Sequence, residues 1–292
     1  MEFINKNHLP SAIWGLVTAD ALGVPYEFKR RDSFKVSEMI GYGTHNQPVG
    51  YWSDDSSMML ATLCSFIEKS EIDYTDIMTR FLEWRNDGEY SPGGICFDIG
   101  MAVNRALDRF EMGYAPLKCG GKKTYDNGNG SLMRILPIAF VPHTFRNVAE
   151  LSAITHANEI SVMGCRHYIQ FAESLMQGMS KEAALASLSE CSDEYENLKS
   201  ISSLPRARIS SSGYIVDSLK AAIWCFMNTE SYRDCVITAV ELGDDTDTVA
   251  AIAGGIAGIY YGIGGEYGIP EEWISLLAKR EWIAELISNA TQ

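Results

Sequence analysis

The chain has 292 residues, 46% of them hydrophobic, and a formal net charge of -14 at pH 7. This length suits one large domain or two small ones, and the hydrophobic share is that of a globular protein with a sizeable core. The negative charge, with no stripe rich in Lys or Arg, argues against general binding to nucleic acids or anionic membranes. Phosphate groups would have to bind through metal ions, helix N-termini or backbone amides.

The first predicted helix has an apolar stripe that starts at Ile13 and runs toward Leu22. Helical periodicity continues along most of the chain, whereas sustained alternation of apolar and polar residues is lacking. The sequence therefore predicts an all-α fold. In chain order, the further helices are expected over 56–69, 76–84, 99–110, 147–157, 159–178, 180–190, 215–227, 231–242, 247–262 and 270–288.

Three long stretches interrupt this pattern, at residues 28–52, 111–131 and 191–213. None has the Gly/Ser-rich or Pro-rich composition of a linker between domains. Loops this long in a compact domain usually carry function. With no internal repeat in view, we expect residues 1–292 to form one multi-helix domain.

The seven cysteines show no CxxC or other metal-type spacing. An odd number of cysteines in apolar stretches predicts reduced and mostly buried thiols. The N-terminus lacks the features of a signal peptide, and no segment approaches the roughly 18 apolar residues of a membrane span. We therefore expect a cytoplasmic protein without membrane association. The cysteines are Cys64, Cys96, Cys119, Cys165, Cys191, Cys225 and Cys235.

Two acidic clusters carry the strongest chemical signal. The first acidic cluster is residues 52–57 (WSDDSS), the second is residues 243–248 (GDDTDT), and each precedes a predicted helix. Clustered carboxylates repel one another unless a cation lies between them, and oxygen ligands suit Mg²⁺, Mn²⁺ or Ca²⁺. The alternative is helix capping by Ser53 or Asp245. A cap needs one side chain, so the number of carboxylates and hydroxyls favours a metal site.

The helix after the second acidic cluster is rich in small residues, including Gly254, Gly255 and Gly258. Each glycine costs a helix about 1 kcal/mol relative to alanine, which is tolerated where another helix must approach closely. A membrane-spanning helix is the alternative, but the segment is too short and begins with acidic residues. We therefore expect a central helix that holds its N-terminal carboxylates deep in the structure.

Weaker signals come from four other places. The loop 127–131 (NGNGS) supplies backbone amides and positive-φ positions for an anion, although a plain turn is the alternative. Arg134 nearby is a candidate partner for phosphate or carboxylate. His156 stands at a helix junction, where a lone histidine is more often structural. Glu27 ends a helix, where an acidic side chain is disfavoured by the helix dipole and so hints at a function.

Seven segments together resemble the ADP-ribosylglycohydrolase family, which includes the dinitrogenase reductase-activating glycohydrolase. They follow the order of the family over roughly residues 10–285. The segments are Asp20–Glu27, Thr44–Pro48, Trp52–Ser57, Cys96–Gly100, Asn127–Arg134, Ile154–His156 and Gly243–Thr248.

The resemblance implies an all-α fold with a binuclear Mg²⁺ or Mn²⁺ site. Its metal ligands would be Ser53, Asp54, Asp55, Asp245, Asp247 and Thr248. Glu27 would lie close to the metals on a mobile loop. The substrate's diphosphate would lie against the loop of Asn127, Gly128, Asn129, Gly130 and Ser131, with His156 nearby, and Gly213 and Tyr214 would border the adenosine end. Asp244 receives no ligand role and is expected to serve as a helix cap.

The implied reaction is metal-dependent hydrolysis of the bond at the anomeric carbon of an ADP-ribosylated acceptor, with a protein arginine as the first candidate. Glu27 or Asp55 would provide acid/base catalysis. The partner would be an ADP-ribosylated protein or small molecule, and we expect a monomer. Two departures from the family concern substrate and metal contacts: Ser53 replaces a threonine, and Asn158 replaces a second histidine.

Two other functions stay open. Two hard cations would also serve a phosphoesterase acting on another nucleotide. A non-catalytic member that binds ADP-ribose is the second alternative, which the complete acidic clusters disfavour.

Overall fold

The computed structural model describes residues 1–189 and 193–292, and within these residues it contains helices and isolated bridge pairs but no strand. The prediction of an all-α fold is confirmed. The α-helices are α1 (Leu9–Gly23), α2 (Asp54–Glu68), α3 (Tyr74–Asp87), α4 (Met101–Glu111), α5 (Phe145–Ala153), α6 (Glu159–Met176), α7 (Lys181–Ala186), α8 (Ile215–Met227), α9 (Tyr232–Val240), α10 (Thr246–Tyr261), α11 (Glu271–Leu276) and α12 (Arg280–Thr291).

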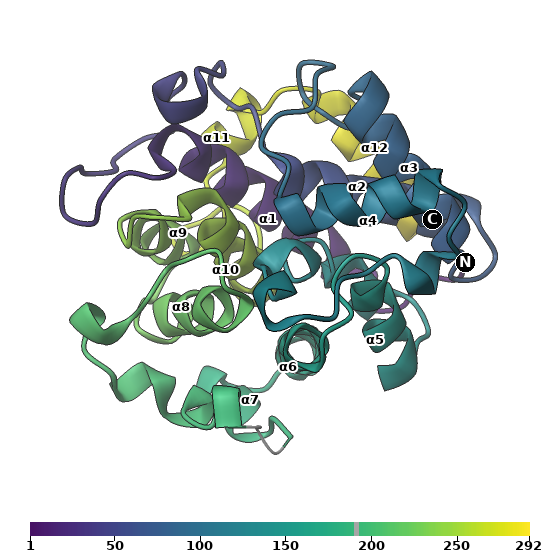
Figure 1. Ribbon diagram of the computed structural model, residues 1–292. Helices are drawn as coiled ribbons and strands as arrows, with labels where there is room; N and C mark the ends of the chain where they lie inside the picture. Colours follow the sequence, from purple (N-terminus) through teal and green to yellow (C-terminus); the bar gives the residue numbers. More distant parts are fainter. Residues whose placement is uncertain (190–192) are drawn as a thin grey trace.

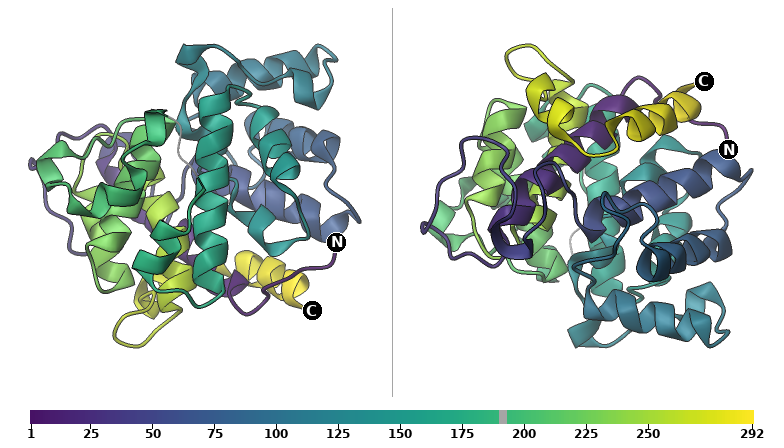
Figure 2. Two further views of the ribbon diagram at one scale, coloured as in Figure 1. Left: turned by 90° about the horizontal axis from the view of Figure 1, so that it is seen from below. Right: turned by 90° about the horizontal axis from the view of Figure 1, so that it is seen from above.

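Helices α1 and α10 form the centre of the molecule and make the most extensive helix–helix contact among the described residues. Figure 1 shows α8 and α9 on one side of this pair and α2, α3 and α12 on the other. The views in Figure 2 show the same division, with α6 running between the two sides. Both central helices are buried along nearly their whole length, as the even distribution of apolar residues in their sequences requires.

Small residues allow α1 and α10 to approach closely. A Cβ atom added at Gly254 would lie 2.4 Å from the Ala19 Cβ and 2.4 Å from the Gly15 carbonyl oxygen. At the end of α1, a Cβ at Gly23 would lie 2.4 Å from the Cα of Asp247. The expected close packing is therefore present, and it fixes the N-terminus of α10 against the C-terminus of α1.

The segment predicted as one helix over 270–288 is two helices, α11 and α12. The N–H of Ala278 donates to the carbonyl oxygen of Gly50 (3.1 Å), and Lys279 has a left-handed backbone with φ of 46°. The 28–52 loop thus packs against the chain at Ala278. Its Gly50 carbonyl oxygen accepts the hydrogen bond that, in a continuous helix, the Ala278 N–H would donate within the helix. This prediction was wrong because a tertiary contact overrides the helical periodicity.

Other boundaries differ less. The 111–131 loop contains the 3₁₀ turns η3 (Pro116–Lys118), η4 (Thr124–Asp126) and η5 (Asn129–Ser131), and α7 ends at Ala186 rather than at 190. The start of the loop predicted over 191–213 and Cys191 lie outside the described residues. The described cysteines form no disulfide, and all except Cys96 are buried. No helix of the described residues has the length and apolar character needed to cross a membrane.

Candidate active site

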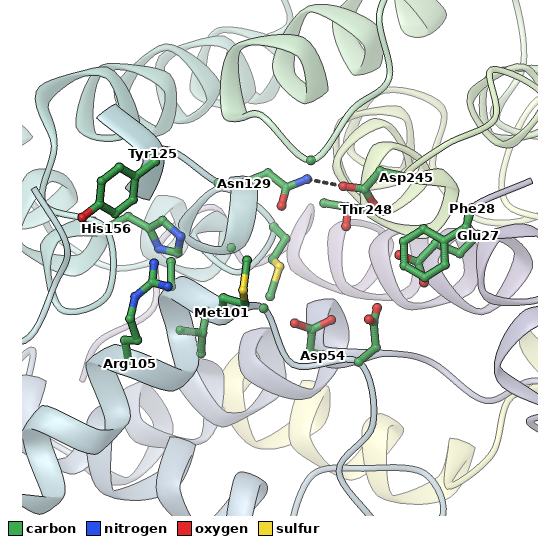
Figure 3. A pocket seen from close by; sticks show the side chains of 18 residues that line it. Glu27, Phe28, Asp54, Met101, Arg105, Tyr125, Asn129, His156, Asp245 and Thr248 are labelled. Atoms are coloured by element: carbon green, nitrogen blue, oxygen red, sulfur yellow. Dashed lines mark hydrogen bonds between the residues drawn. The ribbon is translucent and has the colours of Figure 1, made fainter. Parts of the chain in front are cut away.

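A cavity of about 430 Å³ opens where the N-termini of α2, α4 and α10 converge. Figure 3 shows the carboxylates of Asp54, Glu27 and Asp245 at one end of the cavity, and Tyr125, Arg105 and His156 at the other. The cavity therefore has an acidic end, built largely from the two acidic clusters, and an opposite end with aromatic and cationic groups.

Helix α1 holds the start of α2 through Asp20. One Asp20 oxygen accepts a hydrogen bond from the backbone N–H of Ser53 (3.0 Å), and the other accepts from the N–H (3.0 Å) and hydroxyl (2.5 Å) of Ser56. Burial raises the pKa of Asp20 to about 6, although these hydrogen bonds oppose the rise. Since both oxygens are engaged, Asp20 serves as a cap supplied from a neighbouring helix.

The two acidic clusters meet at Asp55 and Asp247. Oxygens of Asp20, Asp55 and Asp247 lie within 4.8 Å of one another, and so do oxygens of Glu27, Asp245 and Asp247. Asp55 and Asp247 are fully buried, and the Asp55 Oδ1 and Asp247 Oδ2 atoms have no hydrogen-bond partner among the described residues. Burial, followed by repulsion from neighbouring carboxylates, raises the pKa of each well above its usual range.

These observations fit a cation site. A buried carboxylate oxygen without a hydrogen-bond partner lowers the stability of the fold. A cation between the carboxylates would bind the unpartnered oxygens and cancel the repulsion between them. The donor set consists of carboxylate and hydroxyl oxygens, which suits Mg²⁺ or Mn²⁺. The structure thus brings three of the expected ligands, Asp55, Asp245 and Asp247, into the groups that could hold metal.

The other expected ligands occupy different positions. Asp54 and Thr248 line the cavity, whereas the Ser53 hydroxyl donates to Asp55 Oδ2 (2.9 Å) and accepts from the Asp55 N–H (3.3 Å). Asp244 is exposed and does not cap α10, because Asp245 occupies the cap position. The expectation for Asp244 was wrong because a left-handed turn at φ 58° turns this residue out of the helix start.

Glu27 belongs to a further group with His45 and Asp98, two residues to which the sequence patterns assigned no role. His45 Nε2 hydrogen-bonds to a Glu27 carboxylate oxygen, and the Thr44 hydroxyl donates to the Glu27 carbonyl oxygen (2.6 Å). Burial raises the pKa of Glu27 to about 7; repulsion by Asp98 adds to this effect, whereas the bond to His45 opposes it. The 28–52 loop therefore holds Glu27 at the acidic end. Both missed residues lie in segments that carry the family resemblance.

The 127–131 loop packs against the start of α8. Asn129 N–H donates to the Gly213 carbonyl oxygen (3.0 Å), and its side-chain Nδ2 donates to Asp245 Oδ2 (2.7 Å). None of residues 127–131 has positive φ, so that part of the expectation was wrong. The glycines supply space instead: a Cβ at Gly130 would lie 3.0 Å from His156 Cε1.

The expected substrate-contact residues divide into two sets. Those that line the cavity are Gly128, Asn129, Gly130, His156 and Gly213. Asn127, Ser131 and Tyr214 do not line it. Asn127 Oδ1 accepts a hydrogen bond from the buried Ser161 hydroxyl (2.8 Å), and Tyr214 packs against the core. These three residues hold the loop and the start of α8 in place rather than contact the cavity.

Arg134 lies behind the cavity and not in it. Its guanidinium group is fully buried, with the central carbon 5.0 Å from the ring centre of Phe81. The expectation that Arg134 binds a phosphate or carboxylate was therefore wrong, because a fully buried side chain cannot reach a ligand. The cation that lines the cavity is Arg105, whose Nη2 lies 2.9 Å from Asp126 Oδ1. No sequence pattern singled out Arg105, which lies on an otherwise ordinary amphipathic helix.

Asn158, at the position where the family resemblance implies a second histidine, is the N-cap of α6. Its Oδ1 accepts from the Ile160 N–H (3.0 Å), and its Nδ2 donates to the Lys122 carbonyl oxygen (2.8 Å). Asn158 does not line the cavity. This departure from the family therefore changes a helix cap rather than a lining group.

This chain is similar to known proteins along nearly its whole length. A family model described as ADP-ribosylglycohydrolase matches residues 6–292. The ADP-ribosylarginine hydrolase Tri1 of Serratia proteamaculans is 32% identical over 94% of this chain and 76% of its own length. The ADP-ribosyl-dinitrogen reductase glycohydrolase of Rhodospirillum rubrum is 28% identical over 91% of this chain and 88% of its own. A solved structure, described as an ADP-ribosylglycohydrolase-related protein complex, superposes with a TM-score of 0.82 at 28% identity and covers 98% of this chain and 96% of that one.

Proposed function

Since this chain belongs to the ADP-ribosylglycohydrolase family and is an ADP-ribosyl hydrolase, we propose that it releases ADP-ribose from protein arginine side chains by a metal-dependent reaction. The buried, unpartnered oxygens of Asp55 and Asp247 at the end of the cavity carry the proposal of metal dependence. The arginine acceptor is supported by the relative named as an ADP-ribosylarginine hydrolase, at 32% identity.

Mg²⁺ or Mn²⁺ would be held by the carboxylates that converge at the acidic end, with the nearby hydroxyls as further donors. When bound, the ions would supply Lewis-acid chemistry: they would orient the ribose hydroxyls and lower the pKa of a water molecule. The proposed ligands are Ser53, Asp54, Asp55, Asp245, Asp247 and Thr248.

Glu27 is the proposed acid/base group. Burial raises its pKa above that of an ordinary glutamate, which favours a group that can give a proton and take one back. A proton from Glu27 would go to the departing guanidine nitrogen as the anomeric C–N bond breaks. The ribose then gains oxocarbenium character, and the carboxylates around it stabilise the positive charge. A water molecule would then bond to the anomeric carbon and return a proton to Glu27, which leaves free ADP-ribose and the free arginine. Asp55 is the rival for the acid/base role, but its oxygens face Ser53 and the other carboxylates.

The remaining lining residues are proposed to bind the rest of ADP-ribose. Gly128, Gly130 and His156 would receive the diphosphate, and Gly213 would border the adenosine end. This assignment uses the whole cavity, because the acidic end and the His156 end then take opposite parts of one substrate.

The test uses two peptides, one with ADP-ribosyl-arginine and one with ADP-ribosyl-serine, each incubated with Mg²⁺ or EDTA. We expect free ADP-ribose from the arginine peptide with Mg²⁺, loss of release with EDTA and recovery after Mg²⁺ is restored. Release from the serine peptide alone would refute the acceptor, and undiminished release in EDTA would refute the metal. A nucleoside monophosphate product would instead identify a phosphoesterase, and binding without any release would identify a non-catalytic member.

A further inference from the structure

Arg134 is a buried cation without a carboxylate partner among the described ion pairs. Its Nη2 donates to the Leu151 carbonyl oxygen (3.0 Å) and to the Thr155 hydroxyl oxygen (2.8 Å). Its Nε and Nη1 atoms are buried and have no hydrogen-bond partner in the described part of the chain. Burial of such a group is unfavourable, so its position calls for a reason beyond packing on Phe81.

The Thr155 hydroxyl links Arg134 to His156. A guanidinium group can only donate, so Thr155 Oγ1 must accept from Arg134. The hydroxyl has one proton to give, and His156 Nδ1 lies 2.8 Å from the same oxygen. If Nδ1 carried the proton, the proton of the fully buried Thr155 hydroxyl would have no acceptor among the described residues. His156 Nδ1 is therefore the acceptor, and the proton of a neutral imidazole lies on Nε2.

The Nε2 side of the ring lies toward the glycine positions of the cavity wall. A Cβ atom added at Gly128 or at Gly130 would lie 3.5 Å from Nε2, so only glycine leaves this face of the ring open. His156 lines the cavity near Arg105 and Tyr125 (Figure 3), and no described residue accepts a hydrogen bond from Nε2.

We propose that Arg134 and Thr155 are positioning residues that hold His156 neutral, with its proton on Nε2, as a fixed hydrogen-bond donor to the substrate's diphosphate. The identity of the ligand rests on the proposed function; the tautomer rests on the hydrogen bonds alone. A donor in this fixed orientation suits a phosphate oxygen, which only accepts hydrogen bonds. His156 then takes no part in proton transfer, which falls to the opposite, acidic end of the cavity.

The charges around His156 also favour the neutral ring. Arg134 faces it through Thr155, and the other nearby charges are Arg105 and Asp126, which pair with each other. Burial and, secondarily, the charge of Arg134 lower the pKa of His156 to about 3. The ring is therefore expected to stay neutral and to keep one tautomer throughout the working pH range.

The test is nitrogen NMR of histidine-labelled protein, with the His156 signals identified by their loss in His156→Gln. We expect a protonated Nε2 and an unprotonated Nδ1 in the wild type. Thr155→Val removes the hydroxyl while nearly preserving shape, and should mix the tautomers and raise the Kd for ADP-ribose about tenfold. Thr155→Ser keeps a hydroxyl and should restore both. KM should rise more than kcat falls, because a binding contact is lost and the acid/base group is untouched.

Each outcome bears on a separate part of the proposal. A wild-type His156 with its proton on Nδ1, or doubly protonated near pH 7, would overturn the positioning role even if Thr155→Val failed to fold. Unchanged tautomer and ADP-ribose binding in Thr155→Val would overturn it as well. If the wild type neither binds ADP-ribose nor hydrolyses its conjugates, the proposed function and the named ligand fail, whereas the tautomer still decides the role of Arg134 and Thr155.

Discussion

At the scale of single residues, the unpartnered oxygens of Asp55 and Asp247 make the sharpest prediction. Asp55→Asn or Asp247→Asn removes a charge that a cation would need, and should lower turnover by at least about 100-fold. The same change should stabilise the EDTA-treated protein, because an amide avoids the cost of burying a carboxylate. Steady-state kinetics, calorimetric Mg²⁺ titration and thermal unfolding measure these effects.

The matched control is Asp244→Asn, in the same acidic cluster but exposed. It should resemble the wild type in all three measurements. Full activity of Asp55→Asn or Asp247→Asn would contradict the metal site, and so would an equal loss in Asp244→Asn.

Arg105 makes a second prediction at this scale. It lines the cavity opposite the carboxylates, with its side chain 41% exposed and paired with Asp126. Arg105→Ala should raise KM about tenfold with little change in kcat, because a charge-assisted contact to a bound anion is lost while the acidic end is untouched. Arg280→Ala, on α12 and paired with Glu281, is the control for loss of one surface cation. An unchanged KM would show that Arg105 does not contact the substrate.

The sequence predicts some site residues and misses others for a physical reason. Asp55 and Asp247 stand out because carboxylates are crowded along the chain around them. Asp20 and Asp98 stand alone in the sequence, and their importance appears only when helix ends from distant segments meet. Arg134 shows the opposite error: proximity to a glycine-rich loop in sequence says nothing about which side of the loop a side chain reaches.

At the scale of elements, the contact between α1 and α10 positions the acidic end. Gly254→Ala would bring a methyl group within 2.4 Å of the Gly15 carbonyl oxygen and the Ala19 Cβ. We expect a net loss of about 1–3 kcal/mol of stability from overpacking, despite the roughly 1 kcal/mol that alanine gains in a helix. Urea unfolding of the EDTA-treated protein measures the difference.

Gly100→Ala is the control for this substitution, since an added methyl there meets nothing within 4 Å. It should cost less than Gly254→Ala, about 0.5–1 kcal/mol, because Gly100 is the N-cap of α4 and alanine is a poorer cap than glycine. A stability gain in Gly254→Ala would mean that the two helices can separate at little cost, and would contradict the role assigned to the small residues.

The elements themselves were predictable where one helix face repeats over several turns, as in α2, α4 and α8. The ends of the helices were not predictable where a distant part of the chain forms a hydrogen bond with the backbone of the helix. The Gly50 carbonyl oxygen accepts such a bond from the Ala278 N–H, and this contact separates α11 from α12. The 3₁₀ turns of the 111–131 loop are short and lack a periodic signal, so the sequence indicated only a loop.

At the scale of the whole molecule, the fold concentrates carboxylates at one point, and this should govern how stability depends on pH. Without metal, burial raises the pKa of Asp20 to about 6 and of Glu27 to about 7, and raises those of Asp54, Asp55 and Asp247 well above their usual range. The folded protein then binds more protons than the unfolded chain above about pH 4, so the free energy of unfolding falls as pH rises. The stabilisation that comes from protonating these carboxylates is complete below their pKa values in the unfolded chain. It is lost as the pH rises through their raised pKa values in the folded protein.

Metal binding should reverse this trend, because the same carboxylates must lose their protons to hold a cation. We expect the Tm in EDTA to fall from about pH 5 to about pH 8, and Mg²⁺ to raise the Tm strongly at the higher pH but little at the lower. The double variant Asp55→Asn, Asp247→Asn distinguishes the effect of the buried site from the general charge repulsion in a chain with net charge -14. It keeps the surface charges, and it should weaken both the fall of the Tm with pH and the rise of the Tm with Mg²⁺. A Tm in EDTA that rises over this pH range, or an Mg²⁺ effect equal at both ends of it, would mean that the buried carboxylates are stabilised by something other than a cation.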